Sequence, residues 1–267
     1  MVSDLNALPD RPIDQRVEIT GPTNAPMQVH IVPNFADHPL VSGPRYLLED
    51  LRCSYATHLG QHTSGVLLLG INDGTKLTFQ VHTSRPTRAY KVHGQLGKAT
   101  HNYFYKGRPV ERATYSHVTR DKIDKVVAHM QAAHQKKMLE LSGVHMESQT
   151  AYDLAASGLI RPVGSEIPVI YGLRCVHFAS PNFTLEIQAI NENEMYLWTL
   201  ISDLGIQLKT AAHCTGVQCI RQGKFNLEMA LLRKHWQLQN IIDNIERCEK
   251  LLNENRRLLQ PISAALM

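Results

Sequence analysis

Residues 57–76 read THLGQHTSGVLLLGINDGTK, and this stretch raises the main question about the chain. Its second half predicts a buried strand, because Val66 to Leu69 are apolar and glycines stand before and after them. Its first half is a polar loop, and loops at the ends of strands often carry chemistry. This loop has no carboxylate, cysteine or lysine before Gly65, so the residue types that an active-site loop needs are missing.

The composition narrows the class of protein. The chain has 267 residues, of which 43% are hydrophobic and 19% charged, as in a globular protein with a sizeable core. The net charge of +4 permits a polyanionic partner. No apolar run approaches the ~20 residues of a membrane span, so we expect no membrane partner. The five cysteines are scattered and odd in number, which predicts free thiols, no metal site and a reducing compartment.

Strand and helix patterns follow one another irregularly along the chain. Residues 1–45 are rich in proline and predict a single strand, MQVHIV. Further strand patterns lie at 76–82, 89–97, 169–178 and 183–190. Helical patterns lie at 116–137, 148–162 and 193–208. Strands and helices without regular βαβ order indicate an α+β fold with a central mixed or antiparallel sheet, which we assign to residues 46–225.

The last region, residues 226–267, predicts a long amphipathic helix and a tail. Apolar side chains recur along it at a spacing of three to four residues, with one polar break: Leu238, Ile241, Ile245, Cys248, Leu252, Asn255 and Leu259. This spacing fits a helix that packs on its own domain. It also fits a short coiled-coil seam through which two copies of the chain associate as a homo-oligomer.

Four sequence blocks together resemble one known family. The blocks are HTSGVLLLGINDGTKL, RAYKVHGQLGKAT, TAYDLAASGLIRP and FTLEIQAI followed by LWTLISDLG. In order and spacing they resemble the TruB-type RNA pseudouridine synthases over about residues 10–240. The stretches HPLVSGP, VERATYSHVTRDKID and GIQLKT resemble the mitochondrial branch of that family.

The resemblance implies a fold and an activity. It implies a pseudouridine-synthase-like catalytic domain with flanking helices, a long C-terminal helix and no additional RNA-binding domain. The implied activity turns a uridine of mitochondrial mRNA, tRNA or rRNA into pseudouridine after the nucleotide has left its stack, and we expect no cofactor. The implied location is mitochondrial, although the first residues form no convincing transit peptide.

Two positions depart from the family pattern. The family loop reads roughly G-x-L-D-x-x-A-S/T-G, and counting back from Gly65 puts its nucleophilic aspartate on Gly60. The family also keeps an arginine that pairs with this aspartate, and here Trp198 stands in its place. An indole cannot provide the forked donors of a guanidinium. We expect neither Asp73, beyond the strand, nor the two loop histidines to replace the lost carboxylate.

Other family positions are retained. Tyr90 stands where the family keeps a tyrosine that packs against the flipped base, which makes it the candidate base-pocket residue; ordinary strand packing is the alternative. Basic residues nearby are candidate phosphate contacts, namely Arg85, Arg88, Lys91, Lys136, Lys137 and Arg161. Any one of them fits a solvated surface, and their weight depends on whether they share one side of the fold.

Three functions fit these features. The first is a TruB-type pseudouridine synthase homologue whose catalysis is impaired, because Gly60 and Trp198 occupy two key positions. The second is a non-catalytic RNA-binding protein or a mitochondrial ribosome-assembly factor. The third is a protein-interaction module that uses the C-terminal helix.

Overall fold

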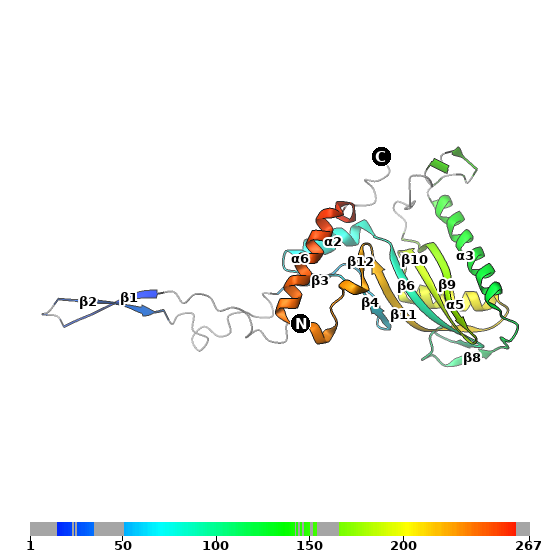
Figure 1. Cartoon of the computed structure of the whole chain (residues 1–267), viewed down its shortest axis with the longest axis horizontal. Helices are drawn as coiled ribbons and strands as arrows, with labels where there is room; N and C mark the ends of the chain where they lie inside the picture. The colour runs from blue at the N-terminus through cyan, green and yellow to red at the C-terminus, as the bar shows by residue number, and fades with distance from the viewer. Residues whose placement is uncertain are drawn as a thin grey trace.

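The computed structural model describes residues 15–22, 24, 26–34, 51–141, 143, 145, 147–149, 152–153 and 166–259. At the amino end, β1 (Gln15–Thr20) and β2 (Gln28–Pro33) pair antiparallel. Nearly all their side chains are exposed, and Figure 1 shows this hairpin apart from the rest of the described chain. The prediction of a single strand here is wrong, because QRVEIT also alternates apolar and polar residues and pairs with the second strand.

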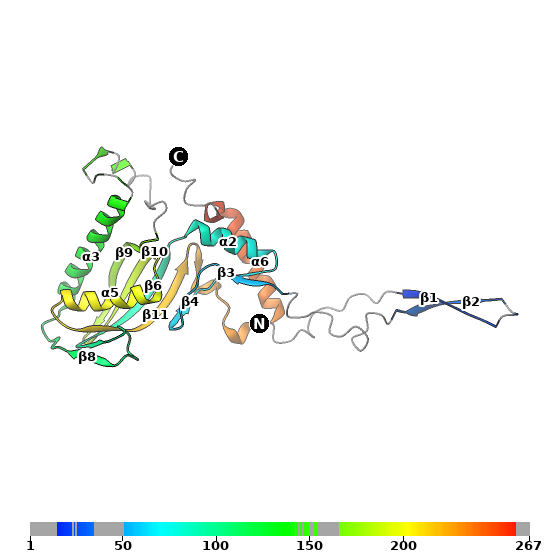
Figure 2. The ribbon, with the colours of Figure 1, turned by 180° about the vertical axis from the view of Figure 1, so that it is seen from behind.

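A central sheet organises the rest of the described chain, and Figure 2 shows it from behind. Its strands lie in the order β12 (Phe225–Asn226), β11 (Ala212–Gln222), β6 (Arg88–Leu96), β10 (Asn182–Ile190) and β9 (Val169–Ala179). These neighbours are antiparallel, whereas β4 (Thr63–Gly65) pairs parallel with β11, so the sheet is mixed. The predicted α+β fold with a central mixed sheet is confirmed. A separate short pair joins β7 (Lys98–Thr100) to β8 (Pro109–Arg112).

Two helices cover one face of the sheet. α3 (Arg120–Leu141) packs on β9, and α5 (Glu194–Gln207) packs mainly on β11 (Figure 2). Apolar side chains of both helices share one buried core with the inner side chains of the strands. Asn193 is the N-cap of α5, and its side chain accepts a hydrogen bond from the Tyr196 N–H at 2.8 Å. This N-cap sets the position of the first turn of α5, which begins with Glu194.

The opposite face of the sheet is more polar. Along β6, Tyr90 is buried and Lys91 is exposed, because successive side chains of a strand point to opposite faces. On the Lys91 face, Arg174 of β9 lies 2.7 Å from Glu186 of β10. The sheet therefore separates Lys91 from Tyr90 and from the core under α5.

The strand predicted at 66–69 is wrong. β4 ends at Gly65, residues 66–68 belong to no strand, and β5 (Leu69–Ile71) pairs with β3 (Cys53–Tyr55). Gly65 explains the break, because its φ is +121° and a Cβ there would overlap the Cys219 carbonyl oxygen. The chain touches the sheet at this glycine and then turns away from it.

The strand predicted at 76–82 is also wrong, because α2 (Gly74–Ser84) occupies this segment. Thr78 and Val81 are buried at helical spacing, whereas Phe79 is 70% exposed. Over so short a window, apolar residues at alternate positions fit a strand and a helix almost equally well. The packing of this segment against its neighbours decides between the two.

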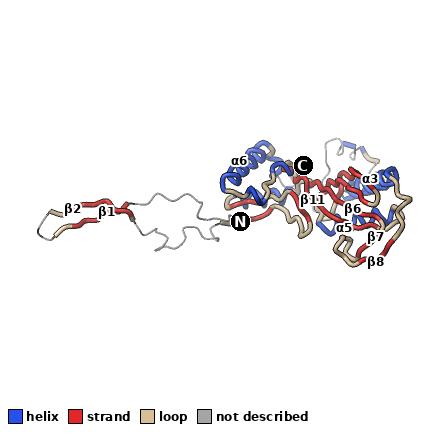
Figure 3. The backbone as a smooth tube through the Cα atoms, turned by 60° about the horizontal axis from the view of Figure 1, so that its bottom comes forward, coloured by secondary structure: helices blue, strands red, loops and turns tan. Residues whose placement is uncertain are grey.

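The helix predicted over residues 226–260 is interrupted. The segment forms in turn η4 (Leu227–Met229), η5 (Arg233–His235), α6 (Leu238–Glu254) and η6 (Arg256–Leu259). Phe225 and Met229 are drawn into a small second core with Val66, against which Cys248 and Leu252 of α6 pack. This packing favours the prediction of a helix on its own domain for these two seam positions. Figures 1 and 3 place α6 and α3 at opposite ends of the sheet-containing part.

Candidate functional site

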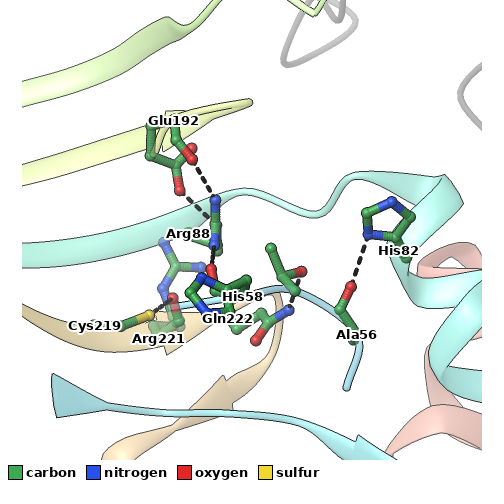
Figure 4. Close-up of polar contacts among 9 residues, drawn as sticks. Ala56, His58, His82, Arg88, Glu192, Cys219, Arg221 and Gln222 are labelled. Carbon is green, nitrogen blue, oxygen red and sulfur yellow. Dashed lines mark hydrogen bonds and ion pairs between the residues drawn. The ribbon is translucent and has the colours of Figure 1, made fainter. Parts of the chain in front are cut away.

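The loop at residues 57–62 is tied to the fold at both ends. Gln222 Nε2 donates to Thr57 Oγ1 at 2.9 Å, and His82 Nδ1 of α2 lies 2.7 Å from the Ala56 carbonyl oxygen (Figure 4). At the other end, β4 runs beside β11. These anchors bring Gly60 against the first turn of α5.

A buried ion pair holds the next layer of the site together (Figure 4). Arg88 Nε lies 2.5 Å from Glu192 Oε1, and the two side chains are 8% and 0% exposed. Arg88 Nη2 also donates to the Glu192 carbonyl at 2.7 Å, and Nη1 donates to the His58 carbonyl at 3.4 Å. These two hydrogen bonds go to backbone carbonyls and help to offset the desolvation of the buried Arg88 guanidinium. The pair connects β6, the end of β10 and the loop.

This ion pair changes the assignment of Arg88. Its guanidinium is buried, so it does not lie at the surface, where we expected a phosphate contact. Arg88 therefore drops out of the proposed RNA contacts. The sequence offered no sign of its partner, because Glu192 lies 104 residues away in the chain.

Tyr90 lies beside the ion pair and is 3% exposed. The Arg88 guanidinium carbon is 5.6 Å from the centre of the Tyr90 ring. Burial raises the pKa of the Tyr90 hydroxyl, and the charge of Glu192 raises it further, so the phenol stays neutral. Burial also raises the pKa of Glu192, against the lowering effect of Arg88. In this structure Tyr90 packs in the core next to the site, and a contact with a base stays a prediction.

Trp198 fills the neighbouring space from α5 and is 6% exposed. Its ring stacks on Phe104 with centroids 4.6 Å apart, and the ring of His62 from the loop lies 5.8 Å away. Its Nε1 is buried and has no hydrogen-bond partner among the residues that the structure describes. An indole N–H left in this state costs about 1–3 kcal/mol. Three rings thus pack at the position that the resemblance assigns to an arginine.

The residue that meets Gly60 is one that the sequence did not indicate. A Cβ on Gly60 would lie 2.6 Å from both Cδ and Oε2 of Glu194. Glu194 Oε1 accepts hydrogen bonds from the His62 N–H at 2.7 Å and from Thr63 Oγ1 at 2.8 Å. Glu194 is 132 residues from His62 in the chain, so no local spacing pointed to this contact.

The remaining basic candidates do not gather in one patch. Lys91 lies on the face of the sheet opposite Tyr90. Lys136 and Lys137 are exposed on the second half of α3, where Lys136 lies 3.9 Å from Glu140. Any RNA path would have to connect separate surfaces.

Two further candidates stand elsewhere. Arg85 follows α2, and its guanidinium lies 3.6 Å from Glu166 and contacts Asn191. Arg161 lies outside the described residues, as does most of the helix predicted at 148–162.

Metal ligands and thiols are the remaining candidates for chemistry. Among the described residues, no group of three or more His, Cys, Asp or Glu could hold a metal ion. No helix in that part of the chain is long and apolar enough to cross a membrane. All five cysteines are free thiols. Burial raises the pKa of Cys214 to about 12 and that of Cys219 to about 11, which keeps both thiols protonated.

Comparisons with known proteins agree with the sequence blocks. The family model described as "TruB family pseudouridylate synthase (N terminal domain)" matches residues 45–196. The mitochondrial pseudouridylate synthase TRUB2 of Xenopus tropicalis is 38% identical over 255 residues, which cover 93% of this chain and 78% of that protein. TRUB2 of Homo sapiens is 42% identical over 214 residues, which cover 80% and 64%. The chain therefore belongs to the TruB family of pseudouridine synthases.

Among solved structures, the archaeal box H/ACA sRNP Nop10–Cbf5 complex is similar with a TM-score of 0.41 and 17% identity. The match covers 79% of this chain and 50% of that one.

Proposed function

We propose that this chain is a mitochondrial TruB-family homologue that binds RNA and whose ability to form pseudouridine is impaired. The observation that carries the proposal is the occupation of one site by Gly60 and Trp198. The loop at Gly60 carries no carboxylate of its own, and Trp198 packs against Phe104 where a guanidinium would be needed. Loss of a catalytic nucleophile commonly slows an enzyme by several orders of magnitude.

The RNA-binding part of the proposal rests on the family and on exposed lysines. A relative from Streptomyces avermitilis is named a tRNA pseudouridine synthase, which supports an RNA partner here. Lys136 and Lys137 extend from α3 and are exposed, so they are available to phosphates. The names of the TRUB2 relatives support a mitochondrial location.

The catalytic part is tested by two pseudouridine measurements. The purified protein is incubated with mitochondrial RNA transcripts, and pseudouridine is also mapped in RNA from cells that lack the protein. We expect no product, or product formed orders of magnitude more slowly than by a relative that keeps the loop aspartate. Product at the relative's rate would overturn the impairment, and would leave the family assignment intact.

The RNA-binding part is tested by reversing charges on α3. In Lys136→Glu/Lys137→Glu, RNA affinity should fall, and the slope of log affinity against log salt should shrink by about one for each phosphate that the variant no longer neutralises. The matched control is Lys250→Glu on α6, at the other end of the sheet, which should bind like the parent. Equal binding by all three proteins at every salt concentration would show that α3 is the wrong surface.

An assembly factor is the second candidate, because an RNA-binding fold can persist after its chemistry is lost. It predicts selective binding to mitochondrial ribosomal RNA and a shortage of ribosomal subunits in cells without the protein. The interaction-module alternative has less support, since Cys248 and Leu252 of the proposed seam pack against the chain's own second core. Ile245 remains 39% exposed, so association of two copies through α6 stays a proposal tested by sedimentation.

A further inference from the structure

The carboxyl group of Glu194 fills the space beside the Gly60 backbone, so the residue type at position 60 and the position of Glu194 depend on each other. The carboxyl group of Glu194 lies where the side chain of any other residue at position 60 would begin, since Cδ and Oε2 are each 2.6 Å from the place of its Cβ. A Cβ does not remain at such a distance from another heavy atom, so a side chain at position 60 requires the carboxyl end of Glu194 to shift away from the loop. An aspartate at position 60 and a glutamate at position 194 therefore cannot both adopt the positions seen here.

The hydrogen bonds show what Glu194 does in that space. Its Oε1 accepts the His62 N–H and the Thr63 hydroxyl, at 2.7 and 2.8 Å. An aspartate can accept the N–H of the residue two positions later in an Asx turn, so an aspartate at position 60 could bond the His62 N–H by itself. Glu194 satisfies from α5 a donor that a loop aspartate could satisfy locally.

Resting on the proposed function, we propose that Glu194 is the carboxylate that faces the Gly60 loop and acts as the positioning residue of this loop. In the family pattern the loop carries the carboxylate and the helix carries its donor, an arginine. Here α5 carries the carboxylate, Glu194, and the loop carries the donors. Glu194 holds the Gly60 loop against α5, and the retained site keeps its shape without the loop aspartate. Restoring Gly60→Asp alone then places a second carboxylate against the first and displaces the contact that holds the loop.

A double-mutant cycle tests this coupling. Gly60→Asp, Glu194→Ala and the double variant are unfolded in urea beside the parent. The backbone strain of a side chain at φ +101° is the same in both backgrounds and cancels in the cycle. We expect Gly60→Asp to reduce the folding equilibrium constant at least roughly tenfold more when Glu194 is present than when it is Ala. Equal reductions in the two backgrounds would overturn the proposal.

Gly223→Ala is the matched control. Gly223 also has a positive φ, of +59°, but a Cβ there would meet Leu258 and Pro86 and no acidic group. Its cost should be the same with and without Glu194. If Gly60→Asp does not fold, the double variant decides: a folded double variant supports the proposal, and an unfolded one overturns it.

Amide exchange at His62 provides the readout specific to positioning. The His62 amide should exchange faster in Glu194→Ala, stay protected in Glu194→Gln, whose amide oxygen still accepts, and regain protection in Gly60→Asp/Glu194→Ala. Unchanged exchange in all variants would overturn the proposal. So would pseudouridine formation by the parent that Glu194→Gln abolishes while His62 stays protected, because Glu194 would then act in the chemistry. These readouts are independent of whether the parent binds RNA, so failure of the proposed function can be told apart.

Discussion

Glu192 and Glu194 flank a single residue, Asn193, yet they lie in opposite surroundings. Glu192 is fully buried with Arg88, while Glu194 is partly exposed and bonded to the loop. Asn193 is extended, with φ −124° and ψ 171°, so the residues around it alternate in direction as in a strand. The junction between β10 and α5 thus sends one carboxylate into the core and uses the other at the site. We therefore expect Glu192 to contribute more than Glu194 to the free energy of unfolding, and Glu194 to act mainly by holding the loop.

The largest effect is expected for the buried carboxylate. Arg88→Met leaves Glu192 as an uncompensated charge in the core and should lower the free energy of unfolding by about 3–5 kcal/mol. Arg88→Met/Glu192→Met should recover most of that loss, because neither charge then remains buried. Urea unfolding measures both variants. A small loss in Arg88→Met, or no recovery in the double variant, would contradict the described role of the pair.

A smaller effect is expected for Glu194. Glu194→Ala removes two hydrogen bonds from a partly exposed carboxylate, which should cost about 1–2 kcal/mol in unfolding free energy. Glu194→Gln should cost less, because it keeps an acceptor of the same length. If Glu194→Ala lowers the free energy of unfolding in urea as much as Arg88→Met does, the expected difference between the two carboxylates is refuted.

The smallest effect is expected in the pH dependence of stability. The pKa of Glu192 is raised above its ordinary value of 4.5, chiefly by burial and against the opposing effect of Arg88. A group with a raised pKa contributes stability that is present below its unfolded pKa and lost as the pH rises through its folded pKa. The parent should therefore gain stability relative to Glu192→Gln as the pH falls from about 7 to about 5. Urea unfolding of both proteins at both pH values measures this difference in stability. A difference between parent and Glu192→Gln that stays constant or shrinks as the pH falls would refute the prediction.

Several of the long elements could be read from the sequence, but β11, an eleven-residue strand of the central sheet, was not predicted. β6, β9 and β10 were predicted because alternating residues over nine or more positions leave no ambiguity of period, and α3 and α5 because their apolar spacing runs over several turns. The sequence does not predict the turn at Gly65. Short apolar runs fit both periods, and the turn at Gly65 depends on Cys219, which belongs to a distant strand.

The candidate site was predictable only in part. The absence of a carboxylate at Gly60 and of an arginine at Trp198 followed from the order of the sequence blocks, because a motif position is defined along the chain. The ion pair of Arg88 and the loop contact of Glu194 did not follow. Both join residues more than a hundred positions apart, and only pairing of the strands and docking of α5 bring them within hydrogen-bond reach.

The family, the α+β class and the residue types missing from the loop all follow from the sequence, since composition, periodicity and motif spacing are properties of the chain. The positions of the charged side chains depend on the tertiary structure. It buried Arg88 where a surface contact was expected, and it set a carboxylate from α5 against Gly60. Burial and hydrogen bonding depend on which surfaces come into contact when the sheet forms, and the local spacing of residues in the sequence does not predict these contacts.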